Sequence, residues 1–404
     1  MTTLTKRRFS TSQQDLKIPG HPIAFHYGFE PIPSPVVRRQ DISLVREINN
    51  DSYKRSNKVF FNPEEKVALL REVRDIYGSD DDAPLFLYHE KDIETPSFET
   101  SINQKSSSRP SKSIRLDIIG TEKSVAEAIL LQTALHILSD EGHKDVTVYI
   151  NSLGDKESLN RFSKELTGYY KSQMNELPAT CRNALKDDIF SLLSCVQHDK
   201  CSILKEDAPK SIAFLTESSR KHFKEVLEHL ETFNVPYKIH NYLVGNKSFS
   251  SRTLFEIKRV SDNLYETPLA CGMRYDYISK KMGFKKDMPS AGIEIILPKK
   301  TSIKTLARPK RPKVGFVHLG FEARLKSLSV LQMLHEAKIP VAHELTSDRI
   351  GPQLLKVERL SLPFMLIMGQ KEAMEKTIIV RNSITREQET LPIDDIRRYL
   401  ETVL

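Results

Sequence analysis

A basic, proline-containing stretch at 298–313 divides the chain into two unequal parts. Its sequence, PKKTSIKTLARPKRPK, holds seven Lys or Arg and no Asp, Glu or Gly. Like charges repel one another and proline favours an extended backbone, so we expect an exposed, semi-extended linker here. The same basic side chains could alternatively lie along a phosphate backbone. The stretch therefore predicts one structural unit before it and another after it.

Residues 314–404 alternate strand patterns with helix patterns. The apolar run VGFVHLG indicates a strand, and FEARLKSLSVLQMLHEAKIP has leucines at helical spacing. VAHEL, a helix over 350–360 and the apolar run PFMLIMG come next. A hairpin of TIIVRNS with REQETLPI and a final helix, DDIRRYLETVL, end the chain. This order predicts a compact α/β domain with a largely parallel sheet.

The part before the linker mixes strands with helices. SIRLDIIG, DVTVYINS, RTLFEIKRV and AGIEIILP have strand patterns, and SVAEAILLQTALHILSDEG between the first two has a helix pattern. Residues 155–236 are almost wholly helical in pattern, which suggests an inserted helical subdomain. We therefore expect a core formed by 1–154 and 237–297, a helical insertion at 155–236, the linker at 298–313 and a C-terminal domain at 314–404.

Composition excludes several classes of protein. The 404 residues are 39% hydrophobic and 28% charged, which is typical of a folded globular chain. No apolar run is long enough to span a bilayer, and the N-terminus lacks the apolar stretch of a secretory signal. Four cysteines are too few for a disulfide scaffold, so we expect a cytoplasmic protein with no membrane association. The net charge of +8 is compatible with a nucleic-acid partner.

Several segments, in the same order along the chain, resemble histidyl-tRNA synthetase, a class II aminoacyl-tRNA synthetase. YGFEPIPSP resembles the end of the first class II motif, with Pro35 as its proline, and NPEEK resembles an early family segment. DIIGTEKSVAEAILL and VYINSLGDKE follow the family pattern, and ELPATCRNAL and LLSCVQHDKC resemble its insertion. LVGNKSFSSRTLFEI and ACGMRYD correspond to the two histidine-specific motifs. QLLKVERLSLPFMLIMG and IIVRNSITREQETLP are similar to the anticodon-binding domain.

The resemblance implies an α+β fold. It consists of a class II core built on an antiparallel sheet, a helical insertion and a C-terminal α/β domain of the anticodon-binding type. In this family the carboxylate of histidine attacks the α-phosphate of ATP, and the resulting histidyl-adenylate acylates tRNA. Charge builds on phosphate oxygens, so such sites use forked guanidinium groups and magnesium. ATP and magnesium are expected only if the chain is active, tRNA is the expected partner, and a homodimer follows by analogy.

The positions of the catalytic arginines depart from the family pattern. In the first histidine-specific motif the arginine falls on Gly245 and the aspartate on Ser248. In the third motif the arginine falls on Lys299, a point charge without the guanidinium fork. The early segment has Lys66 in place of its threonine. The arginine of the second motif is missing, which leaves Lys91, Lys105 and Arg109 as candidates there, and Lys247 is a possible substitute beside Gly245.

Other family positions are retained. The resemblance implies that Glu64, Arg274, Tyr275 and Asp276 bind substrate, although an Arg-Tyr-Asp cluster after a turn can also serve only to fix the start of a helix. Residues expected to bind tRNA lie in the linker and in the C-terminal domain: Lys299, Lys300, Lys304, Lys310, Arg311, Gln353 and Lys356.

Three cysteines fall in the helical insertion. Together with His198, the thiolates of Cys181, Cys195 and Cys201 could form a tetrahedral zinc site. The spacing contains no close Cys-x-x-Cys pair, and buried thiols are the interpretation that the sequence favours. We therefore predict no metal from sequence.

Three functions are consistent with these observations. The first is a degenerate synthetase-like protein that binds tRNA without efficient aminoacylation, with histidine and ATP as optional further ligands. The second is an active histidine–tRNA ligase with a divergent site. The third is a regulatory subunit of ATP phosphoribosyltransferase, whose synthetase-like core normally lacks the C-terminal domain. A protein partner, either a synthetase or an enzyme of histidine biosynthesis, is possible in the first and third cases.

Overall fold

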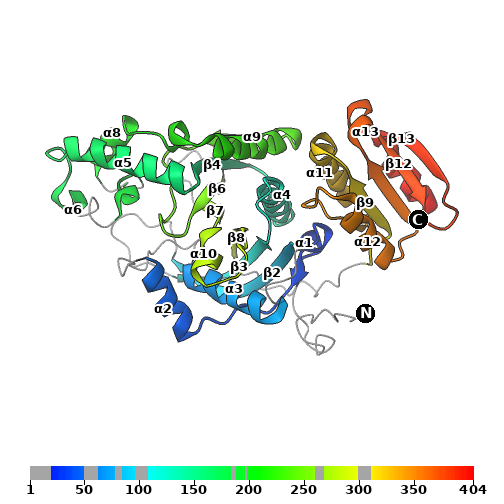
Figure 1. Ribbon diagram of the computed structural model, residues 1–404, viewed down its shortest axis with the longest axis horizontal. Coiled ribbons are helices and arrows are strands. Elements are labelled where there is room, and N and C mark those ends of the chain that lie inside the picture. Colours follow the sequence, from blue (N-terminus) through cyan, green and yellow to red (C-terminus); the bar gives the residue numbers. More distant parts are fainter. Residues whose placement is uncertain are drawn as a thin grey trace.

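A computed structural model describes residues 20–49, 62–77, 84–96, 108–182, 188–193, 195, 198–259, 268–298 and 311–404. Within these ranges the chain forms two sheets, one before the linker and one after it (Figure 1). The first sheet has the order β1-β2-β3-β8-β7-β6-β4-β5 and the second has the order β10-β9-β11-β12-β13.

The large sheet is antiparallel across its six central strands, from β2 to β4. Short parallel strands complete its two edges, because β1 pairs with β2 and β5 pairs with β4. This arrangement confirms the predicted α+β class II core. The strands are β1 (Glu30–Pro31), β2 (Leu85–Pro96), β3 (Ser108–Ile119), β4 (Val146–Gly154), β5 (Tyr237–Ile239), β6 (Ser251–Arg259), β7 (Pro268–Arg274) and β8 (Ser290–Pro298).

One face of this sheet is apolar and packs against helix α4 (Val125–Asp140). Alternate residues of a strand point to opposite faces, so β3 presents Ile114, Leu116 and Ile118 to this core. Helix α4 is buried nearly all round because α9 (Glu217–Thr232) covers its other side. The opposite face of the sheet is polar. Around it lie α2 (Arg39–Ile48), α3 (Pro63–Tyr77) and α10 (Tyr277–Lys281), and α1 (Pro22–His26) packs against α4.

The segment predicted as a helical insertion contains helices throughout its described residues. They are α5 (Lys156–Ser172), α6 (Ala179–Arg182), η1 (Ile189–Leu192), α8 (Asp199–Glu206), η2 (Ser211–Phe214) and α9. The helices before η2 share a small core of their own, which includes Phe162, Phe190 and Cys201. Helix α9 instead packs on α4, β4 and β6, so its apolar face belongs to the main core.

The C-terminal domain has three parallel strands and an antiparallel hairpin. β10 and β11 both pair in parallel with β9, and the predicted hairpin is formed by β12 and β13. Helices follow β9 and β10 and end the domain as the sequence pattern indicated, whereas the short helix between β11 and β12 was not predicted. The elements are β9 (Val314–His318), α11 (Phe321–Glu336), β10 (Val341–Ala342), α12 (Ile350–Arg359), β11 (Phe364–Met368), α13 (Gln370–Glu375), β12 (Thr377–Asn382), β13 (Gln388–Pro392) and α14 (Ile393–Val403).

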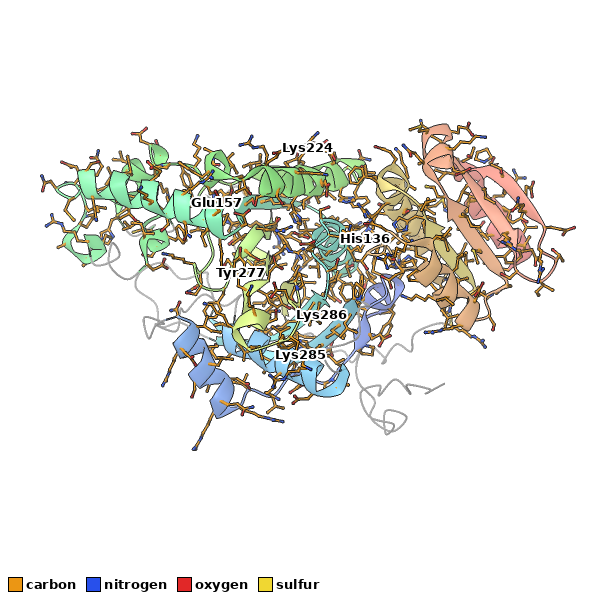
Figure 2. All side chains as sticks on the ribbon, in the orientation of Figure 1. His136, Glu157, Lys224, Tyr277, Lys285 and Lys286 are labelled. Carbon is orange, nitrogen blue, oxygen red and sulfur yellow. The ribbon has the colours of Figure 1, made fainter. Side chains whose placement is uncertain are left out.

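The C-terminal domain rests on the core through α11, which lies beside α4 and α9. His136 lies on α4 at this boundary (Figure 2), and its ring stacks on that of His335 with centroids 5.3 Å apart. His26 Nε2 lies 2.8 Å from the carbonyl oxygen of Leu331, and Gln132 donates a hydrogen bond to Gln332. The apolar core is continuous across the boundary.

Candidate functional site

Charged side chains form a row across the polar face of the large sheet. Strand register places Arg115 of β3 beside Glu294 of β8, which lies beside Cys271 of β7. Cys271 in turn lies beside Glu256 of β6, and Glu256 lies beside Tyr149 of β4. Side chains directly opposite each other on one face of a sheet are in contact range. The row is therefore a continuous polar surface at the centre of the sheet.

Within this row, Arg115 forms ion pairs with two carboxylates. Its guanidinium is paired with Glu65 at the start of α3, and it donates to Glu294 Oε1 at 2.8 Å. The Ser113 hydroxyl donates to the same Glu294 oxygen at 2.5 Å, and Lys91 Nζ donates to Glu65 Oε1 at 2.5 Å. The Arg115 side chain is only 5% exposed. Its charge is consequently balanced by two carboxylates of the protein itself.

A second buried ion pair lies next to this row. Lys66 Nζ donates to Asp117 Oδ1 at 2.6 Å, and the Tyr275 hydroxyl donates to the same oxygen at 2.7 Å. Burial raises the pKa of Tyr275, and the neighbouring Asp117 carboxylate raises it further. Gly292 on β8 makes room for this pair, because a Cβ atom there would lie 2.1 Å from Asp117 Oδ1. Tyr275, predicted to bind substrate, is thus fully buried in a contact with the sheet.

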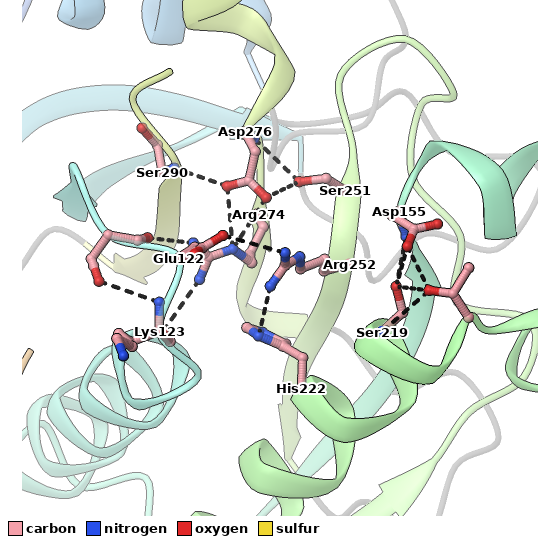
Figure 3. Close-up of polar contacts among 12 residues, drawn as sticks. Glu122, Lys123, Asp155, Ser219, His222, Ser251, Arg252, Arg274, Asp276 and Ser290 are labelled. Carbon is pink, nitrogen blue, oxygen red and sulfur yellow. Dashed lines mark hydrogen bonds and ion pairs between the residues drawn. The ribbon is translucent and has the colours of Figure 1, made fainter. Parts of the chain in front are cut away.

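Arg274, also predicted to bind substrate, is fully buried and bonded within the protein (Figure 3). It donates to Glu127 Oε2 at 2.8 Å, to Asp276 Oδ1 at 3.2 Å and to the carbonyl oxygen of Thr121. Burial alone would raise the pKa of the Glu127 carboxyl, but Arg274 and His222 lower it to about 2. Arg274 thus ties β7 to the start of α4 through Glu127 and the carbonyl oxygen of Thr121.

Asp276 is held by three elements at once. One oxygen accepts a hydrogen bond from the Ser251 hydroxyl at 2.9 Å, and the other accepts from the Ser290 amide at 3.0 Å. Its side chain therefore ties β6 to β8 beside Arg274 (Figure 3). Glu64, the remaining predicted substrate ligand, lies in the first turn of α3 and is largely buried, at 8% exposure.

His222 links Arg252 to the Arg274 cluster. Arg252 Nη1 lies 3.0 Å from His222 Nδ1, and His222 Nε2 lies 2.7 Å from Glu127 Oε1. Since the guanidinium can only donate, His222 Nδ1 accepts and its Nε2–H donates to Glu127. Arg252 has a positive φ of 46°, an uncommon conformation for a residue with a side chain, at a break in the register of β6. The bend directs Arg252 toward His222 and Glu122 (Figure 3).

The position aligned with the family arginine has no room for a side chain. A Cβ atom on Gly245 would lie 2.0 Å from Ser250 Oγ and 2.7 Å from Leu254 Cδ2. Lys247, the suggested substitute, is exposed and lines a shallow groove with α5 residues such as Lys164 and Lys171. Lys91 is paired with Glu65. The backbone of Arg109 lies in β3, and its side chain, like all of Lys105, lies outside the described residues.

The predicted tRNA contacts are placed unevenly. Lys299, Lys300, Lys304 and Lys310 lie outside the described residues, and Arg311 is exposed just before β9. Gln353 is only 1% exposed, and its amide is used inside the domain: it accepts from the His318 amide and donates to the His318 carbonyl oxygen. Lys356 donates to the carbonyl oxygen of His343 at 2.8 Å. These two side chains thus serve the domain's own structure.

Sequence reasoning did not select the residues at the centre of the polar face. Glu65, Arg115, Asp117 and Glu294 are buried carboxylates and a buried cation whose partners come from different elements. Glu127 of α4, which is buried beside Arg274 on the other face of the sheet, was not selected either. A signal was present, because RLDIIG carries charges at alternate positions and AGIEIILP carries a single Glu, each in an otherwise apolar strand. Cys271 also lies in this row, where it is half-buried, and burial raises the pKa of its thiol, so it is not an activated nucleophile.

Comparison with known proteins gives consistent matches. Residues 313–402 match the family described as the anticodon binding domain. The chloroplastic histidine–tRNA ligase of Porphyra purpurea is 27% identical over 310 residues, covering 76% of this chain and 71% of that protein. The histidine–tRNA ligase of Syntrophotalea carbinolica is 24% identical over 402 residues, covering 96% and 94%. The apo histidyl-tRNA synthetase of S. aureus aligns with a TM-score of 0.49 at 20% identity, covering 93% of this chain and 92% of that one.

In the part of the chain that the structure describes, no helix combines the length and the apolar character needed to cross a membrane.

Proposed function

The chain belongs to the histidyl-tRNA synthetase family of class II, and from that premise we propose that it binds tRNA without forming histidyl-adenylate at the rate of a synthetase. The observation that carries the proposal is the pairing of charges on the polar face of the sheet. Lys66, Lys91, Arg115 and Lys258 each face a carboxylate of the protein at ion-pair distance.

Phosphate chemistry needs cations that the protein has not already neutralised. Developing charge on phosphate oxygens is stabilised by donors aimed at it, and removing one such donor costs ~3 kcal/mol, or about 10²–10³ in rate. The absence of two or three would cost about 10⁴–10⁶ even when the effects are not additive. Gly245 offers no donor, and Arg274 has its donors bonded inside the core. Both observations support a weak or absent phosphate clamp.

The described residues of the polar face do not fit magnesium-bound ATP. A magnesium ion is usually held by one or two carboxylates together with substrate phosphates. Here Glu294 already accepts from Ser113 and Arg115, and Glu65 is shared between Lys91 and Arg115. Binding the nucleotide complex at this row would require breaking buried ion pairs, which is costly. We therefore propose no step that uses magnesium or ATP.

The tRNA-binding part of the proposal rests on the C-terminal domain. Its match to the anticodon binding domain covers 313–402, directly after the basic stretch 298–313. The presence of this domain also disfavours a role as a regulatory subunit of ATP phosphoribosyltransferase, since the resemblance implies that such proteins normally lack it. Homodimerisation remains a prediction that sedimentation analysis can test.

A salt series tests the tRNA proposal. Replacing Lys299, Lys300, Lys304, Lys310 and Arg311 by Ala should weaken binding of bulk tRNA in an anisotropy titration. It should also flatten the slope of log affinity against log salt, by a little under one unit for each phosphate that is no longer neutralised. The matched control removes five exposed basic residues of the insertion and α9: Arg161, Lys164, Lys200, Lys221 and Lys224.

The control variant removes the same number of charges from another part of the surface, so it should keep the slope of the unmodified protein if the linker is what contacts the phosphates. Equal affinities and equal slopes for all three proteins would contradict a nucleic-acid role for the linker. A protein partner would instead be favoured by two results together. The affinity of the unmodified chain for tRNA would depend only weakly on salt, and tRNA would not displace a protein that the chain has bound.

A further inference from the structure

Three cysteines and one histidine meet in the helical insertion, about which the proposed function says nothing. Cys181 lies in α6, Cys195 follows η1, His198 is the N-cap of α8 and Cys201 lies in the first turn of α8. The four ligand atoms, three Sγ and one imidazole nitrogen, all lie within 4.8 Å of one another. We propose that these four side chains form a structural zinc site.

The distances between these atoms match a tetrahedral centre. Zinc bonds of about 2.3 Å to sulfur and about 2.0–2.1 Å to nitrogen imply S···S separations of about 3.8 Å and S···N separations of about 3.6 Å. Cys181 Sγ lies 4.0 Å from Cys195 Sγ and 3.5 Å from Cys201 Sγ. His198 Nδ1 lies 3.4 Å from Cys181 Sγ and 3.6 Å from Cys195 Sγ. The same separations are far too long for disulfide bonds, which need about 2.0 Å.

Thr180 orients the imidazole of His198 for metal binding. Nε2 of His198 lies 3.4 Å from the Thr180 hydroxyl oxygen, while Nδ1 faces the sulfur atoms. A hydrogen bond from Nε2–H to Thr180 leaves Nδ1 unprotonated, and this is the form in which a histidine binds a metal. Thr180 is also adjacent to Cys181 in the chain, so one short helix supplies both a ligand and the group that orients another.

The location explains what a metal would contribute. The insertion helices α6, η1 and α8 are short, of four to eight residues, and the small core that they share includes Cys201. Such short helices form poorly without tertiary support. A metal ion bound by α6, the segment after η1 and α8 would join α6, which buries none of its residues, and α8, which buries only Cys201, to the better-buried η1. From sequence alone we favoured buried thiols, because no Cys-x-x-Cys pair is present; the folded chain instead combines Cys195-x-x-His198-x-x-Cys201 with the distant Cys181.

Metal analysis of the full-length chain, purified without a histidine tag, tests the proposal. We expect about one zinc ion per chain. Cys201→Ser should lower this content to below about a tenth, because a closed structural site needs all four ligands. Cys271→Ser is the matched control: it removes a half-buried cysteine of β7, outside the cluster, and should leave the zinc content unchanged.

A cobalt titration of the wild-type chain tests the same site without relying on the folding of a variant. The metal-stripped, reduced wild-type chain should bind one equivalent of Co²⁺, with the visible bands of tetrahedral cobalt and a thiolate charge-transfer band. His198→Cys should keep metal binding but change these bands toward those of an all-thiolate site. The proposal is overturned by a reduced wild-type chain that gives no such spectrum, by iron in place of zinc, or by zinc that persists equally in Cys201→Ser.

Discussion

At the scale of single residues, the site is defined by which charged side chains form ion pairs with one another. Charges at alternate positions of RLDIIG are visible in the sequence, but the partner of Arg115 lies 179 residues away at Glu294. Local patterns report which face of a strand a side chain occupies. They cannot report which strand lies next to it, so a free phosphate-binding cation and an internally paired one look alike in the sequence.

These ion pairs predict that replacing two neighbouring cations of β3 will lower the free energy of unfolding by different amounts. Arg115→Met would leave Glu294 as a buried carboxylate without a cation and Glu65 with Lys91 alone, and breaking a buried pair in this way costs about 3–5 kcal/mol. Lys112→Met, the control, removes a pair with Glu90 from a side chain that is 39% exposed, and should cost at most about 1 kcal/mol. Urea unfolding of both variants measures the difference. Equal decreases in stability would contradict the account of a buried, self-neutralised row.

At the scale of elements, most strands and helices were predictable because their patterns are strong. The hairpin β12–β13, the helix α11 and the helical run after Asp155 all follow from periodicity in the sequence. What periodicity could not indicate is the partner of an element. Helix α9 lies in the segment predicted as an insertion, yet its apolar face packs on α4 and β4 of the main core. Gln353 lies on a helix beside the predicted RNA-binding residues, yet it faces inward to His318.

Two glycines provide a matched test of packing around these elements. Gly245→Ala would place a Cβ atom against Ser250 and Leu254, so we expect stability to fall by about 1–3 kcal/mol. Gly168→Ala in α5 meets nothing within 4 Å and should raise stability by about 0.5–1 kcal/mol, since alanine favours a helix interior over glycine. Thermal unfolding measures both. For the same reason Gly245→Arg should not restore catalysis; a variant of full stability with recovered activity would contradict the packing seen at this position.

At the scale of the whole molecule, the boundary between the core and the C-terminal domain carries several histidines. Burial, together with the neighbouring His335 and His136, lowers the pKa of His26 to about 4. Burial likewise lowers the pKa of His136 to about 4, helped by His335. The folded state therefore keeps these imidazoles neutral, whereas in an unfolded chain they titrate near 6.5.

These pKa values predict how stability changes with pH. Below about pH 6.5 the unfolded state binds more protons than the folded state. The free energy of unfolding therefore has its full value above that pH and decreases as the pH drops toward 4. Each such histidine adds up to one proton to the slope, about 1.4 kcal/mol per pH unit. Urea unfolding between pH 7 and pH 4 measures this slope, and His136→Gln should make it shallower. Stability that is constant from pH 7 to pH 5 would show that the boundary does not depend on neutral histidines.

The central claim is that this synthetase-like chain does not activate histidine efficiently, because the cations of its polar face are paired with its own carboxylates and Gly245 supplies none. Histidine-dependent pyrophosphate exchange, measured with ATP and magnesium beside an ordinary histidyl-tRNA synthetase, tests it most directly. We predict exchange that is undetectable or at least about 10³-fold slower than in that enzyme. Exchange at an ordinary rate would contradict the claim and identify the chain as an active histidine–tRNA ligase with a divergent site.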